Sequence, residues 1–208
     1  VSELLVPRIR SHLTSQTPLP QPGYTPPAVR PTGRTVVIDP GHGGKDPGAI
    51  SYLGYHEKEV NLKVAQKVAW ILKNQGVKVI MTRNNDAFIE KEERADIANR
   101  AGADLFVSIH HNANHSRVHR GYTIYIAPNA SDTSRRTGRL IEKAMGSTGL
   151  SSNGMRTNDY RVLMRTQGPA VLVECGYLSN PSEAAILYDG SMQNRIADAI
   201  AQGILQSL

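Results

Sequence analysis

The sequence predicts an α/β fold, a three-layer α/β/α domain built on a mostly parallel sheet. Short apolar runs rich in β-branched residues alternate along the chain with segments of helical period. Glycine, proline, asparagine or aspartate separates most of these segments, as at turns and helix ends. Such alternation is typical of parallel strands covered by helices on both faces.

Length and composition limit the possible classes of protein. The 208 residues suit one domain plus a tail, and the net charge of +6 suggests an anionic partner or surface. The basic residues are scattered and no aromatic ladder accompanies them, so we expect no nucleic-acid partner. Cys175 stands alone, which excludes an internal disulfide. No apolar run is long enough for a transmembrane segment.

The first 33 residues differ in composition from the rest of the chain. Residues 14–33 contain six prolines among Thr, Gln and Gly, a composition typical of an extended linker. We therefore place an N-terminal segment and Pro-rich linker at 1–33 and the folded domain at 34–208. Because the chain begins at Val1 rather than Met, we interpret it as a trimmed or mature form whose export signal was removed.

Six apolar runs predict the strands of the sheet. Thr35 to Ile38 is short and β-branched, and it leads into a turn of proline and three glycines around His42. The other five runs share this length and apolar character; they are 77–82, 105–110, 122–126, 161–164 and 170–174. The stretch 147–159 is rich in Ser, Asn, Gly and Thr, and the loop predicted from Gly146 to Tyr160 is a candidate wall of a substrate cleft.

Five helices are predicted between and after these runs. The first has apolar residues from Val60 to Leu72 on one face and ends at Gly76. Capping residues and helix-ending glycines mark two more, which begin at Asp86 and Asp132 and end at Gly102 and Gly146. A short helix opens at 180–181 with an asparagine cap and a first-turn proline, and a closing helix covers 192–207.

Polar groups follow several strands, and parallel strands bring their carboxyl ends to one sheet edge. His42 follows the first strand, His110 ends the third, and Glu174 ends the last. Glu57 begins a helix near the same edge. Two histidines and one carboxylate from separate elements can bind zinc and leave a fourth position for water. The competing interpretation is a cleft with a few hydrogen-bonded core histidines.

A spare carboxylate beside such a metal indicates hydrolysis of a carbonyl compound. Zinc lowers the pKa of bound water to about 7, and a nearby carboxylate can take the proton and pass it to a leaving amine. Glu174 would be that carboxylate.

Four motifs, in order along the chain, resemble those of the zinc-dependent N-acetylmuramoyl-L-alanine amidases, the amidase-3 family. The motifs are VIDPGHGG at 37–44, EKEVNL at 57–62, SIHHNA at 108–113 and PAVLVECGYLSN at 169–180. The resemblance covers roughly residues 35–208. It implies a twisted sheet of about six strands and hydrolysis, with one Zn²⁺, of the bond between N-acetylmuramic acid and L-alanine in peptidoglycan. By position it implies His42, Glu57 and His110 as zinc ligands and Glu174 as the catalytic glutamate.

The resemblance also implies a location and a set of partners. We expect a periplasmic or extracellular protein of the bacterial cell wall, a monomer that binds the muramyl peptide of peptidoglycan. Some relatives carry an inserted helix that blocks the zinc site until a partner removes it. We find no such insertion between Asn112 and Glu174, so we predict an open cleft and doubt an activator protein.

Several neighbouring residues have alternative roles. His111 and Asn112 are candidate substrate-binding residues, although neighbours on a strand point to opposite faces and His110 takes the site face. Asn61 and Asn112 could also brace the ligands through hydrogen bonds. Glu59 or His56 could replace Glu57, although we expect Glu59 to stabilise its helix and His56 to lie in a loop. For Arg83 and Arg94 we expect ion pairs with Asp or Glu.

Two other functions remain open. The first is a binding module that holds peptidoglycan without cutting it. The second is a zinc peptidase or deacylase that acts on other amides.

Overall fold

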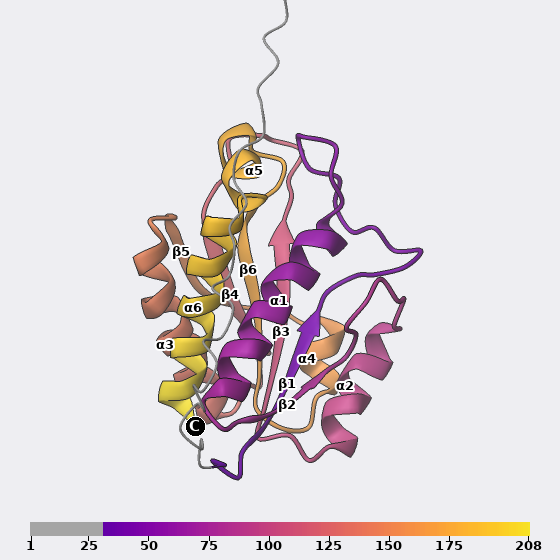
Figure 1. The fold of residues 1–208 in the computed structure, drawn as a ribbon, viewed down its shortest axis with the longest axis vertical. Helices are drawn as coiled ribbons and strands as arrows, with labels where there is room; N and C mark the ends of the chain where they lie inside the picture. Colours follow the sequence, from indigo (N-terminus) through magenta and orange to yellow (C-terminus); the bar gives the residue numbers. More distant parts are fainter. Residues whose placement is uncertain (1–30) are drawn as a thin grey trace, which may run out of the picture.

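The computed structural model describes residues 31–208, so most of the predicted N-terminal segment and linker lies outside the described residues. Within this range, six strands form one sheet with helices on both of its faces (Figure 1). The predicted three-layer α/β fold is confirmed.

The sheet has the order β2-β1-β3-β6-β4-β5. Its strands are β1 (Thr35–Pro40), β2 (Lys78–Met81), β3 (Leu105–Asn112), β4 (Tyr122–Ile126), β5 (Ser152–Thr157) and β6 (Ala170–Tyr177). Neighbouring strands are parallel except β4 and β6, which are antiparallel. The sheet is therefore mostly parallel, as predicted, and β1, β3 and β6 end at one common edge.

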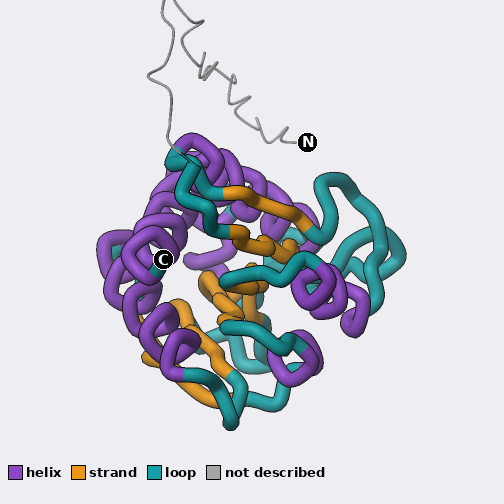
Figure 2. Tube along the Cα trace, turned by 90° about the horizontal axis from the view of Figure 1, so that it is seen from below, coloured by secondary structure: helices purple, strands orange, loops and turns teal. Residues whose placement is uncertain are grey.

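Two hydrophobic clusters attach the helices to the sheet. The larger cluster contains residues of α1 (Glu57–Asn74), α3 (Asp132–Met145) and α6 (Gly190–Ser207), and the smaller contains residues of α2 (Lys91–Arg100) and α4 (Arg161–Arg165). In β1, Val36 and Ile38 belong to the larger cluster and Val37 to the smaller, because alternate side chains of a strand point to opposite faces. Figure 2 shows the strands between these two helical layers. Two short elements complete the chain, η1 (Gly146–Thr148) and α5 (Pro181–Leu187).

One predicted strand is wrong and one strand was missed. Residues 161–164 lie in helix α4 rather than in a strand. Val162 and Leu163, which are consecutive in this helix, are both buried. A short apolar run does not distinguish a strand from a buried helical turn. The missing strand is β5, which lies within the predicted loop 147–159. It is a polar edge strand without a buried face, so no apolar alternation marked it.

The start of the second helix also differs from the prediction. Helix α2 begins at Lys91, and Asp86 does not cap it. The Asp86 carboxylate instead accepts hydrogen bonds from the Gly44 amide at 2.8 Å and from the Lys58 ammonium at 2.7 Å. Asp86 therefore anchors the turn that follows β1 to the start of α1.

The structure also bears on membrane insertion. Within residues 31–208, no helix combines the length and the apolar character needed to cross a lipid bilayer.

Candidate metal centre

Three predicted ligands meet at the carboxyl edge of the sheet. His42 lies in the turn after β1, His110 lies near the end of β3, and Glu57 is the first residue of α1. One ligand atom from each of these residues lies within 4.8 Å of the other two. The structure therefore brings together the three side chains that the sequence predicted, as a group that could hold a metal ion.

Tight backbone packing creates this meeting point. His42 has a φ of 62°, the left-handed region that non-glycine residues seldom occupy. A Cβ atom on Gly41 would lie 2.1 Å from the imidazole of His110, and one on Gly48 would lie 2.6 Å from the Glu57 carboxylate. The glycines of this turn are needed because side chains would occupy the space that the ligands take.

Hydrogen-bonding groups orient each ligand. The two oxygens of Glu57 lie 3.1 Å from His42 Nε2 and 3.0 Å from His110 Nδ1. The other ring nitrogen of His42, Nδ1, lies 2.8 Å from the Asp46 carboxylate. A carboxylate on the far nitrogen of a histidine is a common partner in metal sites, where it fixes the ring orientation. Sequence reasoning missed Asp46, although its position four residues after His42 is a usable signal.

A second layer of buried residues supports Glu57. Asn61 donates a hydrogen bond from its amide to Glu57 Oε1 at 3.0 Å and another to the Gly41 carbonyl at 3.2 Å. The Oδ1 atom of Asn61 lies 2.8 Å from Nδ1 of His111, and the backbone amide of His111 donates to Glu57 Oε1 at 3.2 Å. The ring of His111 is buried, and burial lowers its pKa to about 4. It lies among bracing residues, so the substrate contact predicted for it gains no support from its position.

Asp39, near the end of β1, anchors the turn that carries His42. This carboxylate is fully buried and accepts hydrogen bonds from Thr82, Ser108 and Arg94, the last at 2.8 Å. Although burial by itself would raise the pKa of Asp39, these partners lower it overall. Arg94 also donates to the carbonyls of Pro40 and His42 at 2.8 Å each, and so connects the ion pair to the ligand turn.

The remaining predicted residues occupy other positions. Arg94 makes the expected ion pair. Within residues 31–208, Arg83 instead donates only to backbone carbonyls, among them those of Pro40 and Gly41. Glu59 lies 3.6 Å from His56, and both side chains are more than 40% exposed. Asn112 is half-buried and accepts a hydrogen bond from the amide of Ala113. Its contact with substrate stays a prediction.

Glu174 lies beside the three ligands without joining their hydrogen bonds. It is directly paired in the sheet with His110, so the two side chains point to the same face from adjacent strands. Its Oε2 atom is buried and has no hydrogen-bond partner within residues 31–208. Burial, together with the negative charge of Glu57, raises the pKa of Glu174 to about 7.

Glu57 and Glu174 thus differ in their protonation. Burial alone would raise the pKa of Glu57, but hydrogen bonds from His110 and His42 hold it well below its usual value. His42 shows the opposite balance: burial alone would lower its pKa, and Glu57 and Asp46 raise it overall. Glu57 is therefore ionised and fit to bind a cation, while Glu174 can hold or release a proton near neutral pH.

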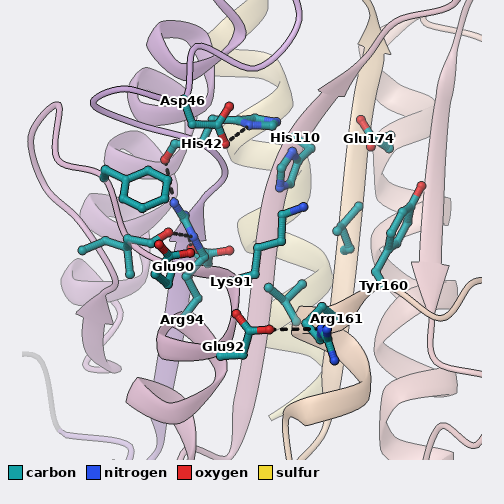
Figure 3. Close-up of a pocket in the computed structure, with 15 residues that line it drawn as sticks. His42, Asp46, Glu90, Lys91, Glu92, Arg94, His110, Tyr160, Arg161 and Glu174 are labelled. Atoms are coloured by element: carbon teal, nitrogen blue, oxygen red, sulfur yellow. Dashed lines mark hydrogen bonds and ion pairs between the residues drawn. The ribbon is translucent and has the colours of Figure 1, made fainter.

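His42, His110 and Glu174 line one cavity of about 500 Å³. Figure 3 shows His42, His110 and Glu174 at one end of it, and Lys91, Glu92, Tyr160 and Arg161 along the walls formed by α2 and α4. Tyr160 is the last residue of the loop 146–160 that the sequence predicted as a candidate cleft wall. Sequence reasoning did not identify Lys91, Glu92 and Arg161 as lining residues.

Comparisons with known proteins agree with this geometry. Residues 36–206 match the amidase-3 family, described as N-acetylmuramoyl-L-alanine amidase. YqiI of Bacillus subtilis is 37% identical over 173 residues, which cover 83% of this chain and 84% of YqiI. The amidase LytC of the same organism is also 37% identical, and the match covers 82% of this chain but 35% of LytC. The chain thus spans about a third of that longer relative.

Solved structures show the same fold. The catalytic domain of the N-acetylmuramoyl-L-alanine amidase CwlV from Bacillus (Paenibacillus) polymyxa var. colistinus is 40% identical, with a TM-score of 0.79 over 83% of this chain and 97% of that domain. The amidase AmiC2 of Nostoc punctiforme is 35% identical, with a TM-score of 0.80 over 85% of this chain and 97% of AmiC2. CwlD of Clostridioides difficile, solved in complex with the GerS lipoprotein, is 30% identical, with a TM-score of 0.77 over 84% of this chain and 98% of CwlD.

Proposed function

The chain belongs to the amidase-3 family of N-acetylmuramoyl-L-alanine amidases, and from this premise we propose that it hydrolyses the amide between N-acetylmuramic acid and L-alanine in peptidoglycan. The observation that carries the proposal is the position of Glu174, a buried carboxyl group paired in the sheet with His110 and directly beside the His-Glu-His group.

We infer that His42, Glu57 and His110 hold a zinc ion. Two imidazoles and one carboxylate form a donor set that suits Zn²⁺ and leaves a position for water. The Asp46 and Asn61 contacts to the ligands are of the kind that fix ligand orientation in metal sites. When bound, zinc would polarise the amide carbonyl and lower the pKa of water to about 7.

Glu174 performs the proton transfers in this mechanism. As a water oxygen attacks the carbonyl carbon of the scissile amide, the Glu174 carboxylate accepts the proton that the water loses. Glu174 then donates this proton to the alanine nitrogen, and the carbon–nitrogen bond breaks. The products are a lactyl carboxylate on the sugar and a peptide with a free amino group on L-alanine. Glu174 lines the cavity, and its Oε2 atom has no hydrogen-bond partner within the described chain, so no existing bond must break for the carboxylate to take a proton.

The same cavity supports activity without an activator. Between Asn112 and Glu174 the chain forms β4, α3, η1, β5 and α4, and of these only the α4 region lines the cavity. We therefore propose that the protein acts without an activator. We also propose that it is a monomer and that it acts on peptidoglycan outside the cytoplasm, at the cell wall. The alternative is an arrangement like that of CwlD, which was solved with a lipoprotein.

Product analysis of digested peptidoglycan tests the proposal. We expect the purified zinc-loaded protein to release peptides that begin with free L-alanine and to leave lactyl-terminated sugars, both identified by mass spectrometry. Glu174→Gln keeps the shape of the side chain but removes the base, so it should lower turnover by about 10²–10⁴-fold while zinc stays bound.

Three results would contradict the proposal. Peptide fragments cut at other amides would indicate a different amide hydrolase. If Glu174→Gln kept near-normal turnover, Glu174 would not perform the proton transfers. If the wild type bound peptidoglycan without turnover, the protein would be a binding module.

A further inference from the structure

A lysine in the cavity wall has no role in the mechanism above. Lys91 is the first residue of α2 and lines the same cavity as His110 and Glu174. Figure 3 shows its side chain extending from the first turn of α2 toward His110. The described residues 31–208 offer its ammonium group no hydrogen bond and no ion pair, so the charge is available to a bound molecule.

The other cations of this wall are already engaged. Arg94 is buried and donates to the Asp39 carboxylate and to backbone carbonyls. Arg161 lies 3.1 Å from the Glu92 carboxylate. Lys91 therefore differs from both arginines, because it can form a new ion pair without breaking an existing one.

Helix stability does not account for a lysine at this position. The amino end of a helix carries partial positive charge, so a cation in the first turn is unfavourable. Glu92 and Glu93 supply the favourable first-turn charges of α2. Replacing Lys91 should therefore leave the helix intact, which makes the residue suitable for a test of binding.

The chemistry of the substrate identifies the side that Lys91 would contact. In the muramyl sugar the only carboxyl group is consumed in the scissile amide, so that side offers no anion near the reaction. On the peptide side, the first carboxylate comes from an acidic residue that follows L-alanine. It lies a few bonds from the scissile nitrogen, and the four-carbon stem of lysine gives the ammonium comparable reach.

We propose that Lys91 is a specificity-determining residue, which binds the carboxylate of an acidic residue next to L-alanine and disfavours stem peptides in which that carboxylate is amidated. This inference rests on the proposed function. Glu90 lines the same cavity and opposes an anion, whereas the charge of Glu92 is balanced by Arg161. Among the described residues, Lys91 is the only lysine that lines the cavity, so discrimination depends on its ammonium group.

Two muropeptides that differ only in carboxylate or carboxamide at the residue after L-alanine test the inference. For the zinc-loaded wild type we expect kcat/KM to be about tenfold higher for the carboxylate form, the lower range for a hydrogen bond to a charged group. Lys91→Met should remove most of this preference and change kcat/KM for the amide by less than twofold. Lys73→Met, an exposed lysine in the last turn of α1, is the matched control and should keep the preference.

Each contrary result has a distinct meaning. If Lys91→Met lowered kcat/KM equally for both muropeptides, the inference would be overturned, because the lysine would then act on the reacting carbonyl. A wild type that hydrolyses both forms equally would overturn it as well, and the proposed function would stand. A wild type that hydrolyses neither form would overturn the proposed function together with the inference.

Discussion

Replacement of Gly41 by alanine should destroy the metal centre without unfolding the domain. Gly41 lies in the turn between β1 and His42, and its amide donates to the Ile109 carbonyl at 3.0 Å. The Gly41 hydrogen that a side chain would replace points directly at the imidazole of His110. A methyl group on this residue therefore competes with a metal ligand for the same space.

The geometry gives the size of the effect. The added Cβ would lie 2.1 Å from two atoms of the His110 ring, whereas ordinary contact begins at 3.4 Å. The ring or the turn must then move by about 1.3 Å, the difference between these two distances. Metal–ligand distances are held to within roughly 0.2 Å, so His110 can no longer share an ion with His42 and Glu57. We expect zinc affinity to fall by at least 100-fold, the upper range for loss of a group that merely orients a ligand.

Competition with a chromophoric chelator measures the affinity, and two other glycines serve as controls. A Cβ on Gly190, at the start of α6, meets nothing within 4 Å, so Gly190→Ala should keep both zinc and stability. A Cβ on Gly203 would lie 2.6 Å from Ile141 Cα, so Gly203→Ala should separate α3 from α6 and cost about 1–3 kcal/mol of unfolding free energy with zinc still bound. Wild-type zinc affinity in Gly41→Ala would refute the reasoning.

Two further predictions concern the buried polar groups. The pKa of Asp39 is lower in the folded protein than its ordinary value of 3.8, so its stabilising effect is complete above about pH 4 and is lost as the pH falls through the folded value. Asp39→Asn should leave the Arg94 charge unpaired and cost about 3–5 kcal/mol of unfolding free energy at pH 7. It should also flatten the decline of unfolding free energy between about pH 4 and pH 2. Urea titrations at each pH measure the unfolding free energy, and a decline as steep as in the wild type would contradict the prediction. Asn61→Leu should weaken zinc binding by about 10–100-fold, because Glu57 and His111 both lose the amide that orients them. Isothermal titration of the metal-free protein measures this loss, and unaltered affinity would show that Asn61 serves only packing.

The layered fold and the ligand group were predictable because topology determines them. Once β1 and β3 are recognised as parallel strands, their carboxyl ends must meet, and His42 and His110 follow from that. The buried runs of these strands are continuous and apolar, so their pattern is distinct. The prediction failed where the pattern was weak: β5 is polar and lies at the sheet edge, and residues 161–164 are too few to show a period.

The part of the cavity wall that α2 and α4 form was not predictable for a different reason. Lys91 and Arg161 face the site only because these helices begin beside it, and that depends on the lengths of irregular segments. Asp86 illustrates the same limit. Asp86 stands at the right distance before a helical pattern to cap the helix, but its carboxylate accepts a hydrogen bond from the Gly44 amide instead. This tertiary contact, rather than the local sequence, determines its partner.

Metal content in three forms of the protein tests the central claim most directly. Elemental analysis after dialysis against chelator-free buffer should find one zinc per chain in the wild type and in Glu174→Gln, and close to none in His110→Ala. This pattern would show that His110 is a ligand and that Glu174 lies outside the ligand set. Zinc retained in His110→Ala, or lost in Glu174→Gln, would contradict the account.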